Sequence, residues 1–369
     1  MCKAAGKETL KLRYMQGNIK ENLQGSIRYL DAGEKPETRA LYETAFPEDS
    51  REFTDYYYQW KTKDNEIIVM EGACRGSAFH VMIHLNPYNI CVYGKTVEIP
   101  YLVAVATARE QRRKGKMGAV MRHALRDMER EGIPFTFLLP ADPAYYKGQG
   151  FEFFPCQQSF VIQEGGIAAN TDCRIATAQD AAQMASFANR ILERRYGIYI
   201  RRDAYYYRRA LEELKAEHGN AVLLRNHGRL CGILLYGLDG AEYGGTAEVK
   251  ELLLEKKVSR EEAARFCQKI LESQGIMAEP KFTVSRMMVR ITSLLTLAPY
   301  LKSRKPVSLT VKVKDSIIEA NNGCFQIDID ETGGSIERIA PTGAEHKMDI
   351  TKLTKELFAD TAVYLNEWV

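Results

Sequence analysis

Residues 98–154 read EIPYLVAVATAREQRRKGKMGAVMRHALRDMEREGIPFTFLLPADPAYYKGQGFEFF. The apolar run from Tyr101 to Ala106 contains valines and is bounded by polar residues, so it predicts a buried strand. A basic turn that contains glycines, Arg112 to Gly118, follows it. Apolar side chains then recur at helical spacing from Met117 to Met128, which predicts an amphipathic helix. The apolar run from Phe135 to Leu139 completes a strand–turn–helix–strand unit.

The basic turn has the chemistry of an anion site. The first turn of a helix has free N–H groups, and the helix dipole adds positive charge there. Gly115 lets the backbone approach a phosphate closely, and Gly118 keeps the first helical turn slim. The spacing is neither that of a P-loop nor the dinucleotide fingerprint G-x-G-x-x-G. A diphosphate fits the turn better than a single phosphate does, although the turn alone is also typical of a solvated helix start.

The whole stretch resembles the GNAT superfamily of N-acetyltransferases. That family binds diphosphate through R/Q-x-x-G-x-G/A, after a strand of the V-x-V type. Arg112-x-x-Gly115 matches the first two anchors, and Val105-Ala-Thr107 stands where the strand signature belongs. Met117 departs from the usual third Gly or Ala, as in Eis-type (enhanced intracellular survival) members. The segment that ends in Tyr145-Tyr146-Lys-Gly-Gln-Gly-Phe151 matches the second anchor of the family.

The resemblance implies the activity and most of the site. It implies that acetyl-CoA is the acetyl donor, that Tyr146 protonates the departing thiolate, and that the terminal carboxylate of Val369 is the base or relay. It also implies a homo-oligomer, a hexamer in Eis-type enzymes, and no metal. The residues expected to bind acetyl-CoA are Val105, Ala106, Thr107, Arg112, Arg113, Lys114, Gly115, Lys116, Met117 and Gly118.

A second segment, residues 48–60, is rich in acids and aromatics and reads EDSREFTDYYYQW. Acids attract a cationic amine, and aromatic rings cover its carbon skeleton, so the segment predicts an acceptor pocket. An amphipathic helix with half-buried tyrosines is the alternative. The acceptor is expected to be a small cationic amine, aminoglycoside- or polyamine-like. The candidate acceptor-binding residues are Glu48, Asp49, Asp55, Tyr56 and Trp60.

Composition limits the class of protein. The chain has 369 residues and a net charge of +3, so it predicts two or three domains and neither nucleic acid nor a membrane as main partner. Its eight cysteines are scattered without a C-x-x-C pair, which indicates buried thiols in the cytoplasm. His80 and His84 lie four apart in a strand-like segment without H-E-x-x-H, so a metal site is not expected.

The order of elements predicts an α/β (α+β) fold in three domains after a loose extension, residues 1–25. Residues 26–163 are the catalytic GNAT domain and end in a strand over 158–163. Residues 164–281 repeat the order of elements without the glycine turn and are expected to be a degenerate GNAT-like domain. Residues 282–369 resemble the sterol-carrier-protein-like domain of Eis-type chains, with the C-terminus in the active site.

Two details of the strand pattern complete the prediction. Asn86-Pro87 predicts a turn between strands over 78–85 and 90–93. Residues 287–291 predict the first strand of the third domain.

The expected function is acetyl-CoA-dependent N-acetyl transfer to a primary amine by direct attack. The alternative is a non-catalytic acyl-CoA- or lipid-binding protein.

Overall fold

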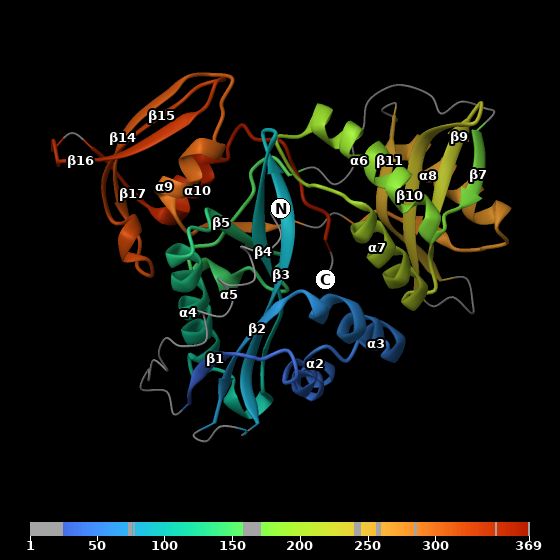
Figure 1. Ribbon diagram of the computed structural model, residues 1–369, viewed down its shortest axis with the longest axis horizontal. Coiled ribbons are helices and arrows are strands. Elements are labelled where there is room, and N and C mark those ends of the chain that lie inside the picture. Colours follow the sequence, from blue (N-terminus) through green and yellow to red (C-terminus); the bar gives the residue numbers. More distant parts are fainter. Residues whose placement is uncertain are drawn as a thin grey trace, which may run out of the picture.

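The computed structural model describes residues 25–72, 76, 78–157, 171–239, 245–255, 260–283, 286–343 and 345–367. The strand predicted over 158–163 and the terminal Val369 lie outside these residues. A large central sheet carries one unit on each side (Figure 1). Within the described residues, no helix is long and apolar enough to cross a bilayer.

The central sheet is built mainly from residues 25–154, which form the first unit. Its strands run in the order β1-β2-β3-β4-β5-β13-β6. One face is covered by α2 and α3, whose tyrosines Tyr42 and Tyr57 pack with Met82 and Ala106. The other face is covered by α4, whose Met121 packs with its own set of sheet residues. The elements are β1 (Ile27–Tyr29), η2 (Lys35–Thr38), α2 (Arg39–Ala45), α3 (Arg51–Trp60), η3 (Lys61–Lys63), β2 (Glu66–Glu71), β3 (Phe79–Val92), β4 (Lys95–Thr107), η4 (Arg109–Gln111), α4 (Lys116–Arg130), β5 (Phe135–Leu138), α5 (Ala144–Lys147) and β6 (Glu152–Phe153).

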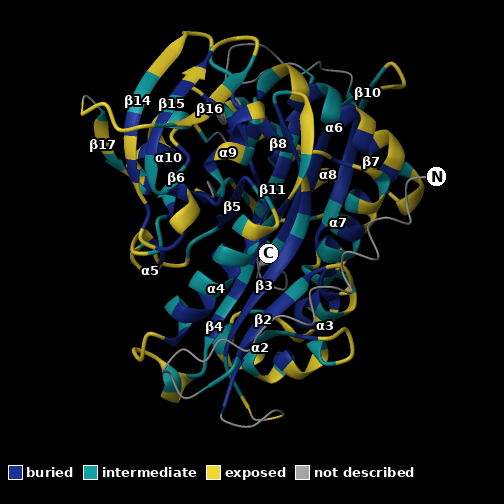
Figure 2. Cartoon of the chain, turned by 60° about the vertical axis from the view of Figure 1, so that its left-hand side comes forward, coloured by how far each residue is buried: buried dark blue, intermediate teal, exposed yellow. Residues whose placement is uncertain are grey.

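The turn predicted at Asn86-Pro87 is wrong, because β3 runs unbroken from Phe79 to Val92 (Figure 2). One edge of β3 pairs with β2 as far as Leu85 and with β8 (Ile198–Ile200) from Ile90 onward. Pro87 lies in the gap between these two partners, so its missing N–H removes no bond from either ladder. The chain reverses instead at Tyr93-Gly94, between β3 and β4, where Gly94 has a φ of +85°.

Strands from the later parts of the chain complete the central sheet. β13 (Met288–Ile291) lies antiparallel between β5 and β6, although the sequence predicts it as part of the third domain. β18 (Val363–Tyr364) pairs with β8, which in turn pairs with β3. The C-terminal segment thus passes between the first and second units (Figure 1). All three predicted domains contribute backbone to one sheet.

The second unit repeats the strand order of the first. Its sheet runs β12-β11-β10-β9-β7, with antiparallel neighbours except the parallel pair β11–β12. The first sheet has the same order from β5 to β1, with β4–β5 as its parallel pair. This agreement supports a tandem GNAT-like fold. The elements are β7 (Thr171–Ile175), η5 (Ala178–Asp180), α6 (Ala181–Arg195), α7 (Ala204–Ala216), β9 (Asn220–Asn226), β10 (Arg229–Asp239), β11 (Thr246–Leu254), α8 (Arg260–Ser273) and β12 (Glu279–Lys281).

The third unit is a four-stranded sheet, β16-β15-β14-β17, with short helices. It shares a continuous apolar core with the first unit, because Phe358 packs edge-on against Phe135 at 5.9 Å and Phe154 at 5.3 Å between ring centres. The two units are therefore packed as one body. The elements are α9 (Leu294–Leu297), η6 (Ala298–Tyr300), β14 (Val307–Lys314), η7 (Glu319–Asn321), β15 (Gly323–Ile329), β16 (Gly334–Ile339), β17 (His346–Asp349) and α10 (Ile350–Leu357).

A buried histidine in β3 makes stability depend on pH. His84 is fully buried, and its Nδ1 lies 2.9 Å from the hydroxyl of Tyr57. Burial, and then the positive charge of Lys35, lower the pKa of His84 to about 3. In the unfolded chain, the His84 side chain binds a proton below a pH of about 6.5. In the folded chain it does not bind this proton until the pH falls to about 3. The folded state therefore loses stability as the pH falls through this window.

We therefore expect the melting temperature to fall between pH 7 and pH 4, and the fall to be smaller in His84→Asn. Asparagine is neutral and can place an oxygen near the position of Nδ1. His346→Gln, at an exposed position, serves as the control and should retain the wild-type slope. Thermal unfolding monitored by circular dichroism measures this, and parallel slopes for wild type and His84→Asn would contradict the assignment.

Candidate active site

The central sheet opens between β4 and β5. These parallel strands pair only at Tyr101–Phe137 and Leu102–Leu138. β5 then ends, while β4 continues to Thr107 with a register shift against β3 and a positive φ of 49° at Ala104. Among the described residues, the edge of β4 from residue 103 to 107 therefore has no strand partner on the β5 side. Its backbone groups are available to a ligand, as an oxyanion site requires.

The turn after β4 exposes backbone and positive charge together. Gly115 is the N-cap of α4 with a φ of +75°, and a Cβ built on it meets nothing within 4 Å. Arg113 has a positive φ of 60°, and the Nε of Arg112 donates to the carbonyl of Thr107 at 3.1 Å. Arg112, Arg113 and Lys114 are exposed. Helix geometry leaves the first-turn N–H groups of α4 facing this open space, which suits a diphosphate.

Lys116 differs from the other cations of the turn because it is buried. Its Nζ lies 2.8 Å from Nδ1 of His80 on β3. Burial, followed by the charge of Lys114, lowers the pKa of Lys116; burial, followed by the charge of Lys116, lowers that of His80. A neutral His80 that accepts from Lys116 fits both directions. Lys116 is thus held inside the turn, and the surface charge comes from the three exposed cations.

Tyr146 lies across the opening from the turn, on α5 just after β5. It is 6% exposed and packs edge-on against Phe151, whereas its neighbour Tyr145 is 61% exposed. Burial, and then Tyr145, raise the pKa of Tyr146 to about 12. The Tyr146 phenol therefore keeps its proton at neutral pH. Burial separates the two phenols in a way that their sequence spacing does not.

A pocket lies where the first unit, the second unit and the C-terminal segment meet. Charged and aromatic side chains from α7 and β11 face the end of the α3–η3 segment across it. It is lined by Lys61, Tyr206, Arg209, Ala210, Glu213, Leu214, Leu235, Lys250, Glu251, Asn366 and Glu367.

Glu367, the last described residue, is bound inside this pocket and is 5% exposed. Its carboxylate accepts from the hydroxyls of Tyr88 and Tyr206, both at 2.6 Å. It also lies 3.2 Å from Nη1 of Arg202, whose Nη2 contacts Glu251 at 2.9 Å. These bonds hold the end of the C-terminal segment between the first two units.

Two tyrosines of the central sheet, Tyr88 and Tyr101, lie in sequence of contact behind Glu367. Tyr88, which donates to Glu367, lies edge-on to Tyr101 with 6.0 Å between ring centres. Burial, and then the charge of Glu367, raise the pKa of Tyr101, and Tyr146 acts on the same group more weakly. Tyr101 is also the residue at which β4 and β5 still pair. Tyr88 and Tyr101 thus connect Glu367 to the point where β4 and β5 separate.

The predicted acceptor residues divide between this pocket and the outer face of α3. Tyr56 donates to Glu213 of the pocket at 2.7 Å. Asp49 accepts from Tyr42 and is affected by the charge of Lys250; burial, as the largest cause, raises the pKa of Asp49. The other three do not line the pocket. Asp55 is exposed and pairs with Arg39, Trp60 lies under the ammonium of Lys63, and Glu48 is exposed.

Sequence reasoning missed most of the pocket. No motif links its charged residues, which are far apart in the chain: Lys61, Arg209, Glu213, Glu251 and Glu367. The only signal was the basic and aromatic run around Tyr205-Tyr206-Tyr207, which packs between the units.

The described residues hold no group of three or more His, Cys, Asp or Glu side chains that could bind a metal ion.

Comparison with known families decides the identity of the first unit. Residues 26–154 match the acetyltransferase (GNAT) domain family, and residues 291–364 match the sterol carrier protein domain family. The chain carries a GNAT acetyltransferase domain. It is an acyltransferase, and GNAT enzymes take their acetyl group from acetyl-CoA.

Solved structures share the fold over about 90% of the chain. A probable N-acyltransferase of unknown function from Enterococcus faecalis is 16% identical, with a TM-score of 0.66 over 90% of this chain and 89% of its own. A GCN5-related N-acetyltransferase from Anabaena variabilis is 14% identical, with a TM-score of 0.68 over 90% of each chain. Eis1 from Mycobacterium abscessus is 11% identical, with a TM-score of 0.62 over 90% of this chain and 89% of its own. No curated protein matches the sequence.

The turn at Gly115 yields a direct prediction for donor binding. Alanine at a φ of +75° costs roughly 1–2 kcal/mol and changes the turn that faces the open space. We expect Gly115→Ala to weaken acetyl-CoA binding about tenfold, and Arg113→Glu to weaken it more by placing an anion beside the diphosphate. Gly33→Ala, with open space and no positive φ, is the matched control and should bind normally. Calorimetry measures all three, and equal affinities would exclude the turn as the donor site.

Proposed function

We propose that the protein is an acetyl-CoA-dependent N-acetyltransferase that acetylates a primary amine of a small cationic acceptor. The observation that carries this proposal is the opening between β4 and β5, with a cationic glycine turn on one side and buried Tyr146 on the other. A donor whose diphosphate binds at residues 112–118 would direct its thioester into that opening. The amides of Val105 to Thr107 are our candidates for polarising its carbonyl.

The reaction is a direct displacement. The amine nitrogen attacks the thioester carbon, the new C–N bond forms as the C–S bond breaks, and the amine proton passes to a base. Tyr146 donates its proton to the leaving sulfur. A phenol with a pKa near 12 is a weak acid for a thiolate in water, but the same burial raises the pKa of the thiol as well, so the two stay roughly matched.

Charge supports a cationic acceptor. Among the described residues, three carboxylates and three cations line the pocket, and three further carboxylates and Arg202 lie beside it. Burial raises the pKa of one of these outer carboxylates, Glu217, to about 7. The carboxylates of the lining could accept from an ammonium group, such as that of a polyamine or an aminoglycoside. The carboxylates are Asp49, Glu213, Glu217, Glu248, Glu251 and Glu367, and the cations are Lys61, Arg202, Arg209 and Lys250.

The base is proposed to be the terminal carboxylate of Val369, from the resemblance to Eis-type enzymes. Glu367 is buried in the pocket two residues before the end of the chain, which supports this choice. A hexameric assembly is proposed from the same resemblance alone. If the terminal carboxylate is not the base, Asp49 and Glu48 are the next candidates, and Asp49 is favoured because it is half-buried and Glu48 is exposed.

Thiol release from acetyl-CoA, measured with a panel of polyamines and aminoglycosides, tests the function and the acid together. We expect turnover with at least one amine, and Tyr146→Phe to lower kcat by about 10²- to 10³-fold with acetyl-CoA affinity within threefold, because only the proton is lost. Tyr145→Phe, at the exposed neighbour, is the control and should keep its rate. Binding of acetyl-CoA without turnover on any amine would favour the acyl-CoA-binding alternative.

Extending the chain by a few residues tests the base. The extension moves the terminal charge, so we expect kcat to fall at least 100-fold on any accepted amine. Val369→Ala keeps the carboxylate, so its kcat should fall far less. An extended enzyme with an unchanged melting temperature and full activity would rule out the terminal carboxylate.

A further inference from the structure

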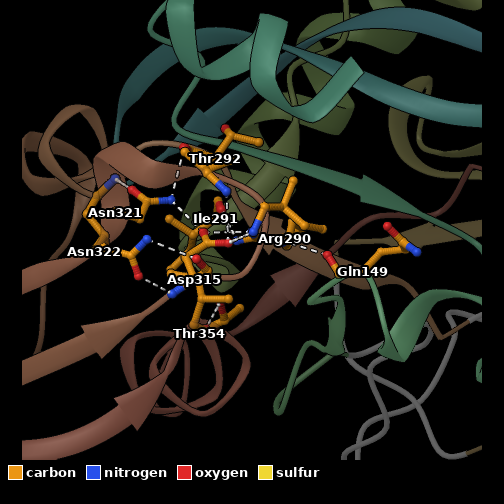
Figure 3. Close-up of polar contacts among 12 residues, drawn as sticks. Gln149, Arg290, Ile291, Thr292, Asp315, Asn321, Asn322 and Thr354 are labelled. Atoms are coloured by element: carbon orange, nitrogen blue, oxygen red, sulfur yellow. Dashed lines mark hydrogen bonds and ion pairs between the residues drawn. The ribbon is translucent and has the colours of Figure 1, made fainter. Parts of the chain in front are cut away.

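A fully buried ion pair joins the third unit to the central sheet. Arg290 lies on β13, and its Nη2 contacts both carboxylate oxygens of Asp315 at 2.7 Å (Figure 3). Both side chains are 0% exposed. A buried pair of this kind is weak evidence for stability, because desolvation offsets most of the attraction. What the ion pair contributes is therefore a fixed geometry between β13 and the third unit.

Asp315 is fixed from the side of the third unit. One carboxylate oxygen accepts from the backbone N–H groups of Ile317 at 2.9 Å and Ile318 at 3.1 Å. The other accepts from the side-chain amide of Asn321 at 3.0 Å. The carboxylate therefore has one orientation, and it sets the position of the guanidinium.

Arg290 uses its remaining donors on the backbone. Its Nε–H donates to the carbonyl of Gln149 at 3.0 Å, in the turn that follows α5. Gly150 has a φ of +83°, and a Cβ built on it would lie 2.6 Å from that Nε. The turn thus rests directly on the guanidinium, with room for hydrogen only.

The same turn carries Tyr146. The N–H of Gln149 donates to the carbonyl of Tyr146 at 2.9 Å, and the N–H of Phe151 donates to it at 3.3 Å. On its other side the turn meets the start of α4, since a Cβ on Gly118 would lie 3.2 Å from the side-chain amide of Gln149. A continuous series of hydrogen bonds therefore leads from Asp315 through Arg290 to the Tyr146 turn, which in turn packs against the start of α4.

We propose that Arg290 is a positioning residue for acetyl transfer, which holds the Tyr146 turn at a fixed place relative to the third unit. This inference rests on the proposed function, in which Tyr146 is the acid. An apolar residue at this position could fill the space, but it would leave the carbonyl of Gln149 without its donor. A displacement of about 1 Å at an acid can cost about 100-fold in rate, so a small loosening of the turn is measurable.

Arg290→Lys is the primary test. Lysine keeps a positive charge beside Asp315 but has no second donor directed at Gln149. We expect kcat to fall about 10- to 100-fold, while KM for acetyl-CoA stays within threefold and the binding stoichiometry stays at one. Arg28→Lys is the matched control. It makes the same change in the ion pair with Glu71, between β1 and β2 of the same sheet, and should keep the wild-type kcat.

Gly150→Ala tests the contact from the opposite side and does not depend on the folding of the arginine variant. Its Cβ would displace the guanidinium or the turn, so kcat should again fall while KM for acetyl-CoA is retained. If Tyr146→Phe slows the enzyme but Arg290→Lys and Gly150→Ala both keep the wild-type kcat, the positioning role is wrong and the proposed acid stands. A wild-type rate for Tyr146→Phe would instead remove the proposed acid, and the positioning inference with it.

Discussion

The separation of β4 from β5 is the constraint on which the rest of the structure depends. Two residue pairs hold the strands together, and β5 then ends while β4 runs on past the strained Ala104. The opening exposes backbone groups that a complete sheet would satisfy. The glycine turn at the start of α4 and the Tyr146 turn after β5 follow directly from the two separated strands, so the geometry of the opening sets where both lie.

Segments from the later parts of the chain pack around this opening and fix its geometry. β13 extends the sheet beyond β5, and Arg290 of that strand contacts the Tyr146 turn. β18 docks through β8, and the buried Glu367 that follows it closes the pocket between the first two units. Buried charges are costly, and here each pair joins segments distant in the chain, which fits a role in positioning better than one in stability.

The local part of this arrangement could be predicted from the sequence. Periodicity gave the strand, basic turn, helix and strand of residues 98–154, and the glycine at position 115 marked the turn that needs a positive φ. The pattern could not show which strands become neighbours, since alternation identifies a buried face but not its partner. For that reason the sequence pattern assigns β13 to the third domain and predicts a turn at Asn86-Pro87, and it does not reveal the pocket lined by Lys61, Arg209 and Glu367.

A crystal structure with bound coenzyme A tests the account most directly. The account predicts that the diphosphate lies against the amides at the start of α4, beside Gly115, with the chain passing between β4 and β5. It also predicts that the sulfur lies within hydrogen-bonding distance of the Tyr146 hydroxyl and faces the pocket that contains Glu367. Coenzyme A bound elsewhere, or bound with its sulfur remote from Tyr146, would contradict the assignment of this opening as the site of acetyl transfer.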